Sequence, residues 1–432
     1  MSENVNGLPG RKQRLDDFMQ KYKLGEFFQK YTMIIALVIV TVAFSIGTEG
    51  KILLPANVTT LISENAYVFV LATGMLLCIL TGGNIDLSVG SVVCFAAAVG
   101  CVMMDNGVNM WLTVLAMLAI GLAIGAFQGF WIAKVRVPAF IATLAGMYAF
   151  RGFSNVVLNG YRVDITNQSF LQLFGNTKSS FIPDVIRQNM PALDSIFNEE
   201  NTLLVSLAGS ANFAKNFNAT CMCIGIVAAL IFVLMKVRKI LVQKKLGISQ
   251  SIPGQIVSIV LISVLILWVS FKLSCYRGFP MVLIWIALVL GIYAYITNKT
   301  AIGRHLYAVG GNEKATALSG VKTRNVYWFA YANIGLLAGL AGILTAGRAK
   351  GIDPVYGEGY EMDAIASCFI GGASAYGGIG KVSGMIIGAI LMGVINKGMS
   401  IVGVDANYQK VVKGIVLLIA VMFDVMSKRQ KR

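Results

Sequence analysis

Apolar and polar stretches alternate along the whole chain in a pattern that predicts membrane-spanning helices. Apolar runs close to the roughly 20 residues that cross a bilayer recur throughout. Twelve apolar segments can be delimited, at 31–47, 64–81, 87–104, 111–133, 137–158, 219–237, 252–271, 280–297, 326–346, 362–378, 382–402 and 409–427. Because lipid offers no hydrogen bonds to the backbone, such segments are expected to be helical. The pattern therefore predicts an all-α polytopic membrane protein.

One polar stretch between two of these segments carries the signs of a very short helix. It reads GRHLYAVGGNEKATALSGVKTRN and covers residues 303–325. A Gly-Gly pair breaks what precedes it, Asn312 is a good N-cap, and Glu313 suits the positive end of a helix. Gly320 can take the left-handed turn that stops a helix. We predict a helix over about 313–319, which must be held by its own domain or by a partner because it is too short to be stable alone. An ordinary solvated loop with a chance cap is the alternative.

Composition agrees with a membrane protein and excludes a simple nucleic-acid binder. The chain is 56% hydrophobic and 13% charged, whereas soluble domains average about 25% charged residues. The formal net charge of +16 could indicate nucleic acid, but the basic residues sit in short stretches between apolar segments. That distribution is typical of the positive-inside rule. We therefore expect membrane lipid, and no nucleic acid, around this chain.

The positions of Lys and Arg also predict the orientation. With the N-terminus inside, the inside stretches hold most basic residues, including Lys299, Arg304, Lys314, Lys322 and Arg324. Both termini and the short helix then face the cytoplasm. The long stretch 159–218 becomes external, either as a partly folded cap or as a disordered insertion.

This orientation divides the chain into consecutive regions. We expect a cytoplasmic N-terminal segment, a first membrane half, an extracytoplasmic loop, further membrane helices, a cytoplasmic coupling loop, a second membrane half and a cytoplasmic tail. Their bounds are 1–30, 31–158, 159–218, 219–297, 298–325, 326–427 and 428–432.

Glycines at four-residue spacing occur in several segments and predict close helix packing. They are Gly121, Gly125 and Gly129, then Gly335 and Gly339, then Gly384 and Gly388. Small residues at this spacing let helix backbones approach closely in lipid. They do not identify a substrate.

Two stretches place polar residues inside the apolar body. In the first, Asn84, Asp86 and Ser88 lie within TGGNIDLSVG, and Ser88 can cap the helix that follows. An unpaired carboxylate at membrane depth is costly, so Asp86 should face protein or water. These residues either satisfy freed backbone groups at a broken helix, or they line or gate a transport path.

The second stretch reads GEGYEMDAIA from residue 357 and is followed by the glycine run 371–378. Glu361 and Asp363 stand at the start of an apolar segment, next to Tyr360. Carboxylates are stabilised at a helix N-terminus, so capping explains them, and a place on the path or gate is the alternative. The glycine run is compatible with a helix that ends inside the membrane.

Enzyme chemistry finds little support in the sequence. The single histidine, His305, lies beside Arg304 in a polar stretch, and no Ser/His/Asp arrangement or metal-ligand spacing is visible. No Gly-Lys-Ser/Thr follows a glycine-rich turn, so we expect no phosphate loop and no bound cofactor in this chain. The seven cysteines are expected to be small apolar packing residues.

Several stretches resemble one transporter family. They are LATGMLLCILTGGNIDLSVGS at 71–91, the stretch 303–325, GEGYEMDAIASCFIGGASAYGGIGKVSG within 357–403, and NYQKVVKGIVLLIAV at 407–421. They resemble the permease subunits of bacterial ribose, galactose and xylose ABC importers, and the likeness spans most of residues 60–427.

The resemblance implies a fold, partners and a mechanism. Such a permease has a ten-helix core, sits in the cytoplasmic (inner) membrane and works as a pair, expected here to be two identical copies. A cytoplasmic ATP-binding subunit, often of two fused domains, carries ATP and Mg, and an extracytoplasmic sugar-binding protein delivers a monosaccharide. The residues that match the loop contacting the ATPase are Gly311, Asn312, Glu313, Lys314, Ser319 and Gly320. Import would proceed by alternating access.

The sequence departs from the shorter ribose-type members in its middle. Three apolar segments lie between the external loop and the stretch 303–325, where those members have one, and a basic linker at 236–250 separates the first two. This looks like an inserted helix pair, as in xylose-type and galactose-type relatives, and it leaves the sugar open.

A carrier driven by a proton or sodium gradient is the main rival to an ATP-driven permease. Such carriers often have a basic loop between their second and third segments, yet residues 82–87 contain no basic residue. A carrier also needs ionisable residues in its body, for which Asp86 is the strongest candidate. A membrane enzyme is a third reading without a catalytic constellation.

Overall fold

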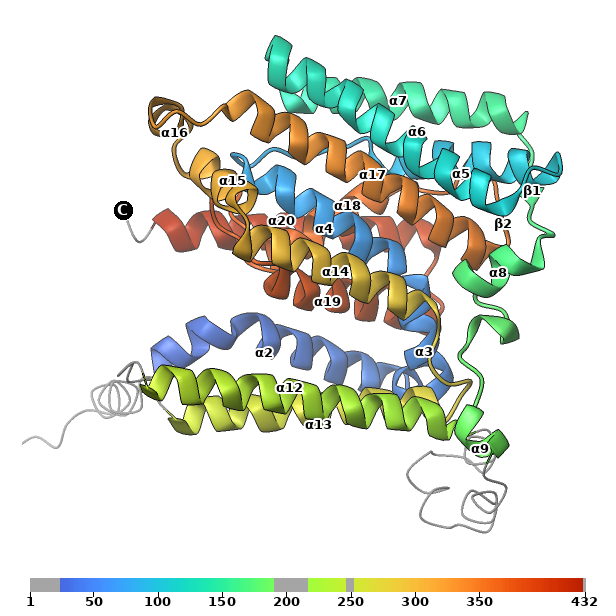
Figure 1. Cartoon of the computed structure of the whole chain (residues 1–432), viewed down its shortest axis with the longest axis vertical. Helices are drawn as coiled ribbons and strands as arrows, with labels where there is room; N and C mark the ends of the chain where they lie inside the picture. The colour runs from blue at the N-terminus through green and yellow to red at the C-terminus, as the bar shows by residue number, and fades with distance from the viewer. Residues whose placement is uncertain (1–23, 190–216, 246–251, 430–432) are drawn as a thin grey trace, which may run out of the picture.

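The computed structural model describes residues 24–189, 217–245 and 252–429. Most of the predicted N-terminal segment, the centre of the predicted external loop and part of the basic linker therefore lie outside the described residues, as do the last three residues. The described chain is helical almost throughout (Figure 1).

The first half of the chain forms a series of helices. They are α2 (Leu24–Gly47), α3 (Pro55–Glu64), α4 (Ala66–Leu80), α5 (Val89–Asp105), α6 (Met110–Phe130) and α7 (Ala139–Leu158). A 3-10 turn, η1 (Lys51–Leu53), precedes α3, and a π-helical turn, η2 (Trp131–Val135), continues α6. The predicted segment 64–81 begins earlier than expected, because Pro55 starts α3 and a bend of 41° joins α3 to α4.

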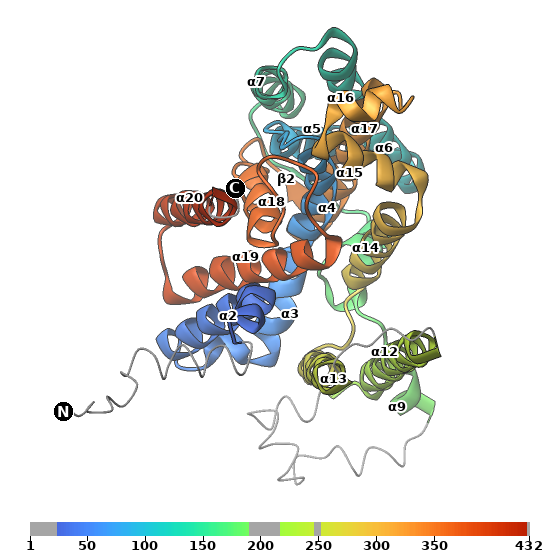
Figure 2. The same cartoon turned by 90° about the vertical axis from the view of Figure 1, so that its left-hand side faces the viewer.

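The middle of the chain begins with small elements and continues with three long helices. The small elements are β1 (Val163–Asp164), α8 (Gln168–Phe174), η3 (Lys178–Ser180) and α9 (Val185–Asn189). The long helices are α12 (Ala219–Lys245), α13 (Ile252–Ser274) and α14 (Val282–Lys299). Helices α12 and α13 pack on one another and stand beside α3 and α9, at the edge of the molecule (Figure 2).

The last part of the chain completes the bundle. It comprises α15 (Ala301–Gly311), α16 (Glu313–Leu318), α17 (Thr323–Ala349), β2 (Gly351–Ile352), α18 (Tyr360–Ile370), α19 (Val382–Val402) and α20 (Ala406–Arg429). Strands β1 and β2 pair antiparallel, with Val163 opposite Ile352, and tie the start of the middle region to the end of α17. The predicted segment 362–378 is helical only to Ile370, and the glycine run after it is irregular backbone.

Helix α15 corrects the interpretation of residues 303–311 as a polar loop. Its apolar residues Ile302, Leu306 and Val309 follow the i, i+4, i+7 spacing of a helix face, and Leu306 and Val309 are buried. The Gly-Gly pair ends this helix, at Gly311, as its prediction as a break implied.

The core is centred on α4, whose residues are all buried. A helix that is apolar on all sides belongs inside a bundle, and α17, α18, α14 and α19 surround it. The glycine ladders act as predicted. A Cβ on Gly121 or Gly125 of α6 would collide with the backbone of α17 at Gly335 and Gly339, so these two helices cross in direct backbone contact.

Six helices in the described part of the chain are long and apolar enough to cross a membrane, or seven if the bent α3–α4 pair is one span. Shorter apolar helices occur at Met33–Gly47, Val89–Asp105 and Ser258–Ser274. The count of twelve spans stays a prediction. The start of α2, the α15–α16 pair and the end of α20 lie at one end of the molecule, and α8, α9, β1 and β2 lie at the other (Figure 1).

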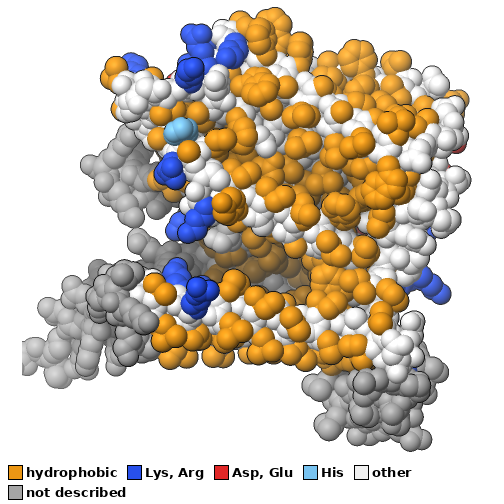
Figure 3. All heavy atoms as spheres, in the orientation of Figure 1, with side chains coloured by type: hydrophobic (Ala, Val, Ile, Leu, Met, Phe, Trp, Pro, Cys, Tyr) orange, Lys and Arg blue, Asp and Glu red, His pale blue; other side chains and the backbone are white. Residues whose placement is uncertain are grey.

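Hydrophobic side chains cover the flank of the bundle between these ends. Lys and Arg side chains gather toward the end that carries α15 and α16 (Figure 3). An apolar flank between polar ends is the surface expected of a protein that crosses a bilayer.

Candidate functional site

The short helix predicted from the sequence is α16, and its cap and stop are those expected. Asn312 has extended backbone, and its Oδ1 accepts a hydrogen bond from the backbone N–H of Ala315 at 3.0 Å. Gly320 adopts a left-handed conformation, with φ +85°. The helix ends at Leu318, one residue earlier than predicted.

Glu313 fixes α16 to the bundle. Its carboxylate forms an ion pair with Arg136, 2.8 Å from Nη2 to Oε1, and accepts hydrogen bonds from the hydroxyls of Thr323 and Tyr327, each at 3.1 Å. Arg136 follows the π-turn η2 in a left-handed conformation, and its guanidinium lies over the Tyr327 ring. One side chain of α16 is thereby joined to the end of α6 and to the start of α17.

Electrostatics keep this carboxylate charged. Burial raises the pKa of Glu313, but the hydrogen bond and charge of Arg136 and the two hydroxyl donors together lower it more, so its pKa lies below the ordinary value. The sequence showed why a carboxylate suits this position, at a helix start. It could not show that Glu313 turns inward to a distant arginine instead of outward to solvent.

The outward face of α16 carries an exposed leucine that was not among the residues predicted from the sequence. Leu318 is 90% exposed, and Gly311, Asn312, Lys314, Ser319 and Gly320 around it are also exposed. Thr316, by contrast, is buried beneath the helix. Two residues along a helix turn the side chain by about 200°. Because Thr316 is buried, Leu318 projects outward from α16.

Helix α15 connects α16 to the centre of the bundle. Gly310 lies so close to the carbonyl of Leu80, at the end of α4, and to Gly378 that a Cβ there would collide with both. The backbone N–H of Gly378 donates to that same carbonyl of Leu80 at 3.0 Å, and the Tyr307 hydroxyl donates to the carbonyl of Gly380 at 2.8 Å. Helix α15 is therefore in direct contact with the end of α4 and with the irregular backbone at 371–381.

The two polar stretches inside the apolar body meet at the starts of α5 and α18. Gly90, in the first turn of α5, lies against the carbonyl of Gly357 and the carboxylate of Glu361. Residues 81–88 and 371–381 are non-helical and join these short helices to their neighbours. Backbone irregularity of this kind is tolerated at membrane depth only inside protein or beside water.

Asp86 is enclosed by its own chain. It is 2% exposed, and its Oδ1 accepts hydrogen bonds from the backbone N–H of Ser88 at 2.8 Å and from the Ser88 hydroxyl at 2.6 Å. The amide of Gln128 on α6 donates to the same hydroxyl at 2.9 Å. Ser88 stands at the N-cap of α5, as predicted, but its hydroxyl makes no capping hydrogen bond and is bonded to Asp86 and Gln128 instead. Gln128 is the one side-chain amide in the predicted segment 111–133, and it could have indicated a polar partner for this stretch.

Asp363 lies in the first turn of α18, as predicted, but its side chain forms an ion pair and does not cap the helix. It is fully buried, and its Oδ2 lies 2.9 Å from Nζ of Lys413 on α20. The Tyr67 hydroxyl on α4 donates to the same oxygen at 2.6 Å, and the cap position of α18 is Gly359, without a side-chain bond. The Tyr360 ring stacks on that of Tyr67. The sequence feature that could have indicated this partner is Lys413, a lysine inside the predicted apolar segment 409–427.

Three of the six candidate path residues remain accessible. Asn84, Tyr360 and Glu361 are half-buried, whereas Asp86, Ser88 and Asp363 are enclosed. Beside Glu361, Arg151 of α7 donates to the carbonyls of Pro354 and Tyr356, at 3.1 and 2.7 Å, and so holds the turn that leads into α18.

The described residues offer no obvious metal site. Within them, no three side chains of His, Cys, Asp or Glu are grouped so that they could hold an ion.

The Asp363–Lys413 pair predicts a clear stability test. Lys413→Met should lower the free energy of unfolding in detergent micelles by about 3 kcal/mol, because it leaves a buried carboxylate without its cation. Combining it with Asp363→Asn should recover most of that loss. Lys410→Met is the matched control, since its ion pair with Glu358 is half-exposed and should contribute under about 1 kcal/mol. Equal losses in Lys413→Met and Lys410→Met would show that the buried pair has no special weight.

Comparisons with known proteins identify the family to which the chain belongs. Residues 57–421 match the family described as branched-chain amino acid transport system, permease component. The chain is 32% identical over 404 residues to the xylose transport system permease protein of Escherichia coli K12, covering 93% of each chain. It is 32% identical to the ribose import permease protein of the same strain over 374 residues, covering 87% of this chain and 86% of that one.

A third similar protein is a ribose import permease protein from another bacterium. That of Bacillus subtilis 168 is 31% identical over 411 residues, covering 95% of this chain and 94% of its own. No solved structure matches the chain. The chain therefore belongs to the family described as branched-chain amino acid transport system, permease component, and over most of its length it is similar to xylose transport and ribose import permease proteins.

Proposed function

We propose that this chain is the pore subunit of an ATP-driven monosaccharide importer, and that α16 is the element through which a separate ATPase moves it. The observation that carries the proposal is the construction of α16. Its outward face presents Leu318 and exposed polar groups, while Glu313 and α15 attach it firmly to the bundle. A two-turn helix built in this way can receive a push and pass it on.

The distribution of charge supports a cytoplasmic position for α16. Lys134, Arg136, Lys299, Arg304 and Lys314 all belong to the stretches predicted to be inside, and basic side chains gather at this end of the bundle (Figure 3). Both chain ends then face the cytoplasm of a bacterium, with the bundle in its inner membrane. The elements around β1 and α8 face outward.

The proposed partners follow from this orientation and from the names of the relatives. An ATP-binding subunit, expected to contain two fused domains, covers α16 and carries ATP and Mg. An extracytoplasmic sugar-binding protein delivers the sugar at the opposite end, and a second identical copy completes the pore. The substrate is a monosaccharide such as xylose, ribose or galactose, and the chain itself catalyses no reaction.

In the proposed mechanism, closure of the ATPase dimer displaces α16 as a rigid lever. The Glu313–Arg136 pair passes that displacement to the end of α6, and Gly310 passes it through α15 to the end of α4. The non-helical residues after α4 and after α18 then change position, and alternating access follows. We assign Asn84, Tyr360 and Glu361 to the sugar path, with Asp86, Ser88 and Asp363 supporting the broken helices from behind.

The exposed leucine is the first test of this mechanism. Leu318→Asp should reduce sugar uptake at least about tenfold, because a charge replaces the apolar contact at the centre of the docking surface. Binding of the ATPase subunit to the permease in detergent should fall in parallel. Leu318→Met is the control and should retain both. Wild-type uptake by Leu318→Asp would argue against docking at α16.

A charge exchange tests the anchor separately from the docking face. Glu313→Arg should uncouple ATP hydrolysis from uptake while leaving the protein in the membrane, because two cations then repel where α16 meets η2. Restoring the pair in reverse, with Arg136→Glu added, should recover much of the uptake. If the double variant stays as defective as Glu313→Arg alone, the side chain itself contacts the partner and the lever is not anchored by this pair.

The source of energy for uptake distinguishes an ATP-driven importer from an ion-driven carrier. In a carrier, the enclosed Asp86 would be the group that couples ion and sugar. Vesicles containing this chain alone, under a proton or sodium gradient, should take up no sugar. Addition of the ATPase and the binding protein, with ATP, should produce uptake. Gradient-driven uptake by the isolated chain would favour the carrier.

A further inference from the structure

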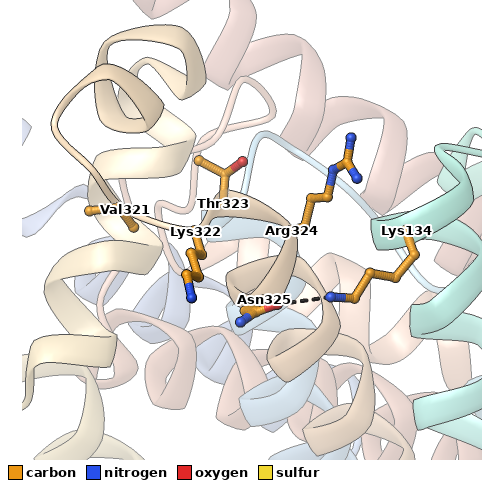
Figure 4. Close-up of a pocket in the computed structure, with 6 residues that line it drawn as sticks. All are labelled: Lys134, Val321, Lys322, Thr323, Arg324 and Asn325. Carbon is orange, nitrogen blue, oxygen red and sulfur yellow. Dashed lines mark hydrogen bonds between the residues drawn. The ribbon is translucent and has the colours of Figure 1, made fainter.

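A groove beside α16 combines positive charge with an apolar wall. It has a volume of about 840 Å³ and is formed by α15, the turn after α16, the start of α17 and Lys134 of η2. A smaller pocket of about 320 Å³ adjoins it, lined by Lys134 and residues 321–325. Figure 4 shows Lys134 reaching across from η2 to Asn325 of α17, with Lys322 at the N-cap position before that helix.

The charge in this groove is not neutralised by the protein. Lys134 donates to the amide oxygen of Asn325 at 3.0 Å, and neither Lys134 nor Lys322 forms an ion pair within the described residues. Neither cavity is lined by a carboxylate. The larger groove also includes His305, and the smaller pocket also includes Arg324. Two lysines that line the same groove without a counter-charge form a site that favours an anion.

The remaining wall of the groove is apolar. Ile302 and Trp328 are each about 40% exposed, and Val326 and Phe329 complete this side. Tryptophan is enriched where membrane helices meet the headgroup layer. A soluble anion would gain nothing from this wall, whereas an amphipathic molecule would use both parts of the groove.

We propose that the groove binds an anionic phospholipid of the cytoplasmic leaflet, with the phosphate between Lys134 and Lys322 and the upper acyl chain along Trp328 and Phe329. This inference rests on the proposed orientation of α16 and goes beyond the proposed transport function. Basic pockets between helices on the cytoplasmic side suit such headgroups. Because the groove is walled by η2, α15 and α17, a bound lipid adds a second bridge beside the Glu313–Arg136 pair.

The test measures lipid retention without any transport assay. The full chain is reconstituted with phosphatidylcholine containing a small fraction of phosphatidylglycerol, extracted, and weighed by native mass spectrometry. Lys134→Ala/Lys322→Ala is compared with Arg238→Ala/Lys239→Ala, a matched pair from α12 outside the groove. Each lysine in contact with the bound phosphate is expected to contribute about 1 kcal/mol, which is roughly fivefold in affinity, whereas Arg238 and Lys239 do not line the groove. The groove variant should therefore retain at least about tenfold less phosphatidylglycerol, and the control should equal the wild type.

Additional arms identify the ligand and guard against misfolding. Melting in phosphatidylcholine alone should be the same for the wild type and both variants, and Lys134→Arg/Lys322→Arg should restore retention if a variant proves unstable. Millimolar inorganic phosphate should not displace the lipid. The proposal is overturned if the groove variant retains phosphatidylglycerol normally, if the control loses it equally, or if phosphate displaces it. Normal lipid retention with lost ATPase binding would assign the lysines to the ATPase instead.

Discussion

The contact between Glu313 and Arg136 is the constraint on which the functional reading of this structure depends. A helix of two turns has little stability of its own, and it can transmit force only if it is fixed to something rigid. The ion pair, the hydroxyls of Thr323 and Tyr327, and the tight seat of Gly310 on α4 provide that attachment. Without them, α16 would be a flexible tether, and movement of a partner would be absorbed in the loop.

The helical bundle to which α16 is attached contains tightly packed long helices and two helices that begin at irregular backbone. Direct backbone contact between α6 and α17, and the buried pair of Asp363 with Lys413, hold the long helices together. Between them, α5 and α18 begin at irregular backbone, which is where a two-state element can change with the least disruption. The enclosed Asp86 and Ser88 stabilise one such interruption from inside the protein. In the proposed mechanism, the interrupted helices are the elements that change position when α16 is displaced.

Local features were predictable from the sequence, and features that join distant segments were not. The cap at Asn312, the stop at Gly320 and the glycine contacts between α6 and α17 follow from residue type and spacing alone. Helix α15 was missed although Leu306 and Val309 carried its periodicity, because glycines and basic residues masked it. The partners of Glu313 and Asp363 could not be derived, since each lies on a helix whose docking only the fold determines. Residue type alone predicts the place of both carboxylates in the first turn of a helix, which the structure has, but not the partner of either.

The most direct measurement of the central claim is the accessibility of residue 318. Leu318→Cys would be placed in a Cys223→Ser background, because Cys223 is exposed and the other six cysteines are buried, and treated with a membrane-impermeant maleimide in vesicles of both orientations. The account predicts labelling from the cytoplasmic side alone, and protection when the ATP-binding subunit is present. Labelling from the external side, or unchanged labelling in the assembled complex, would contradict it.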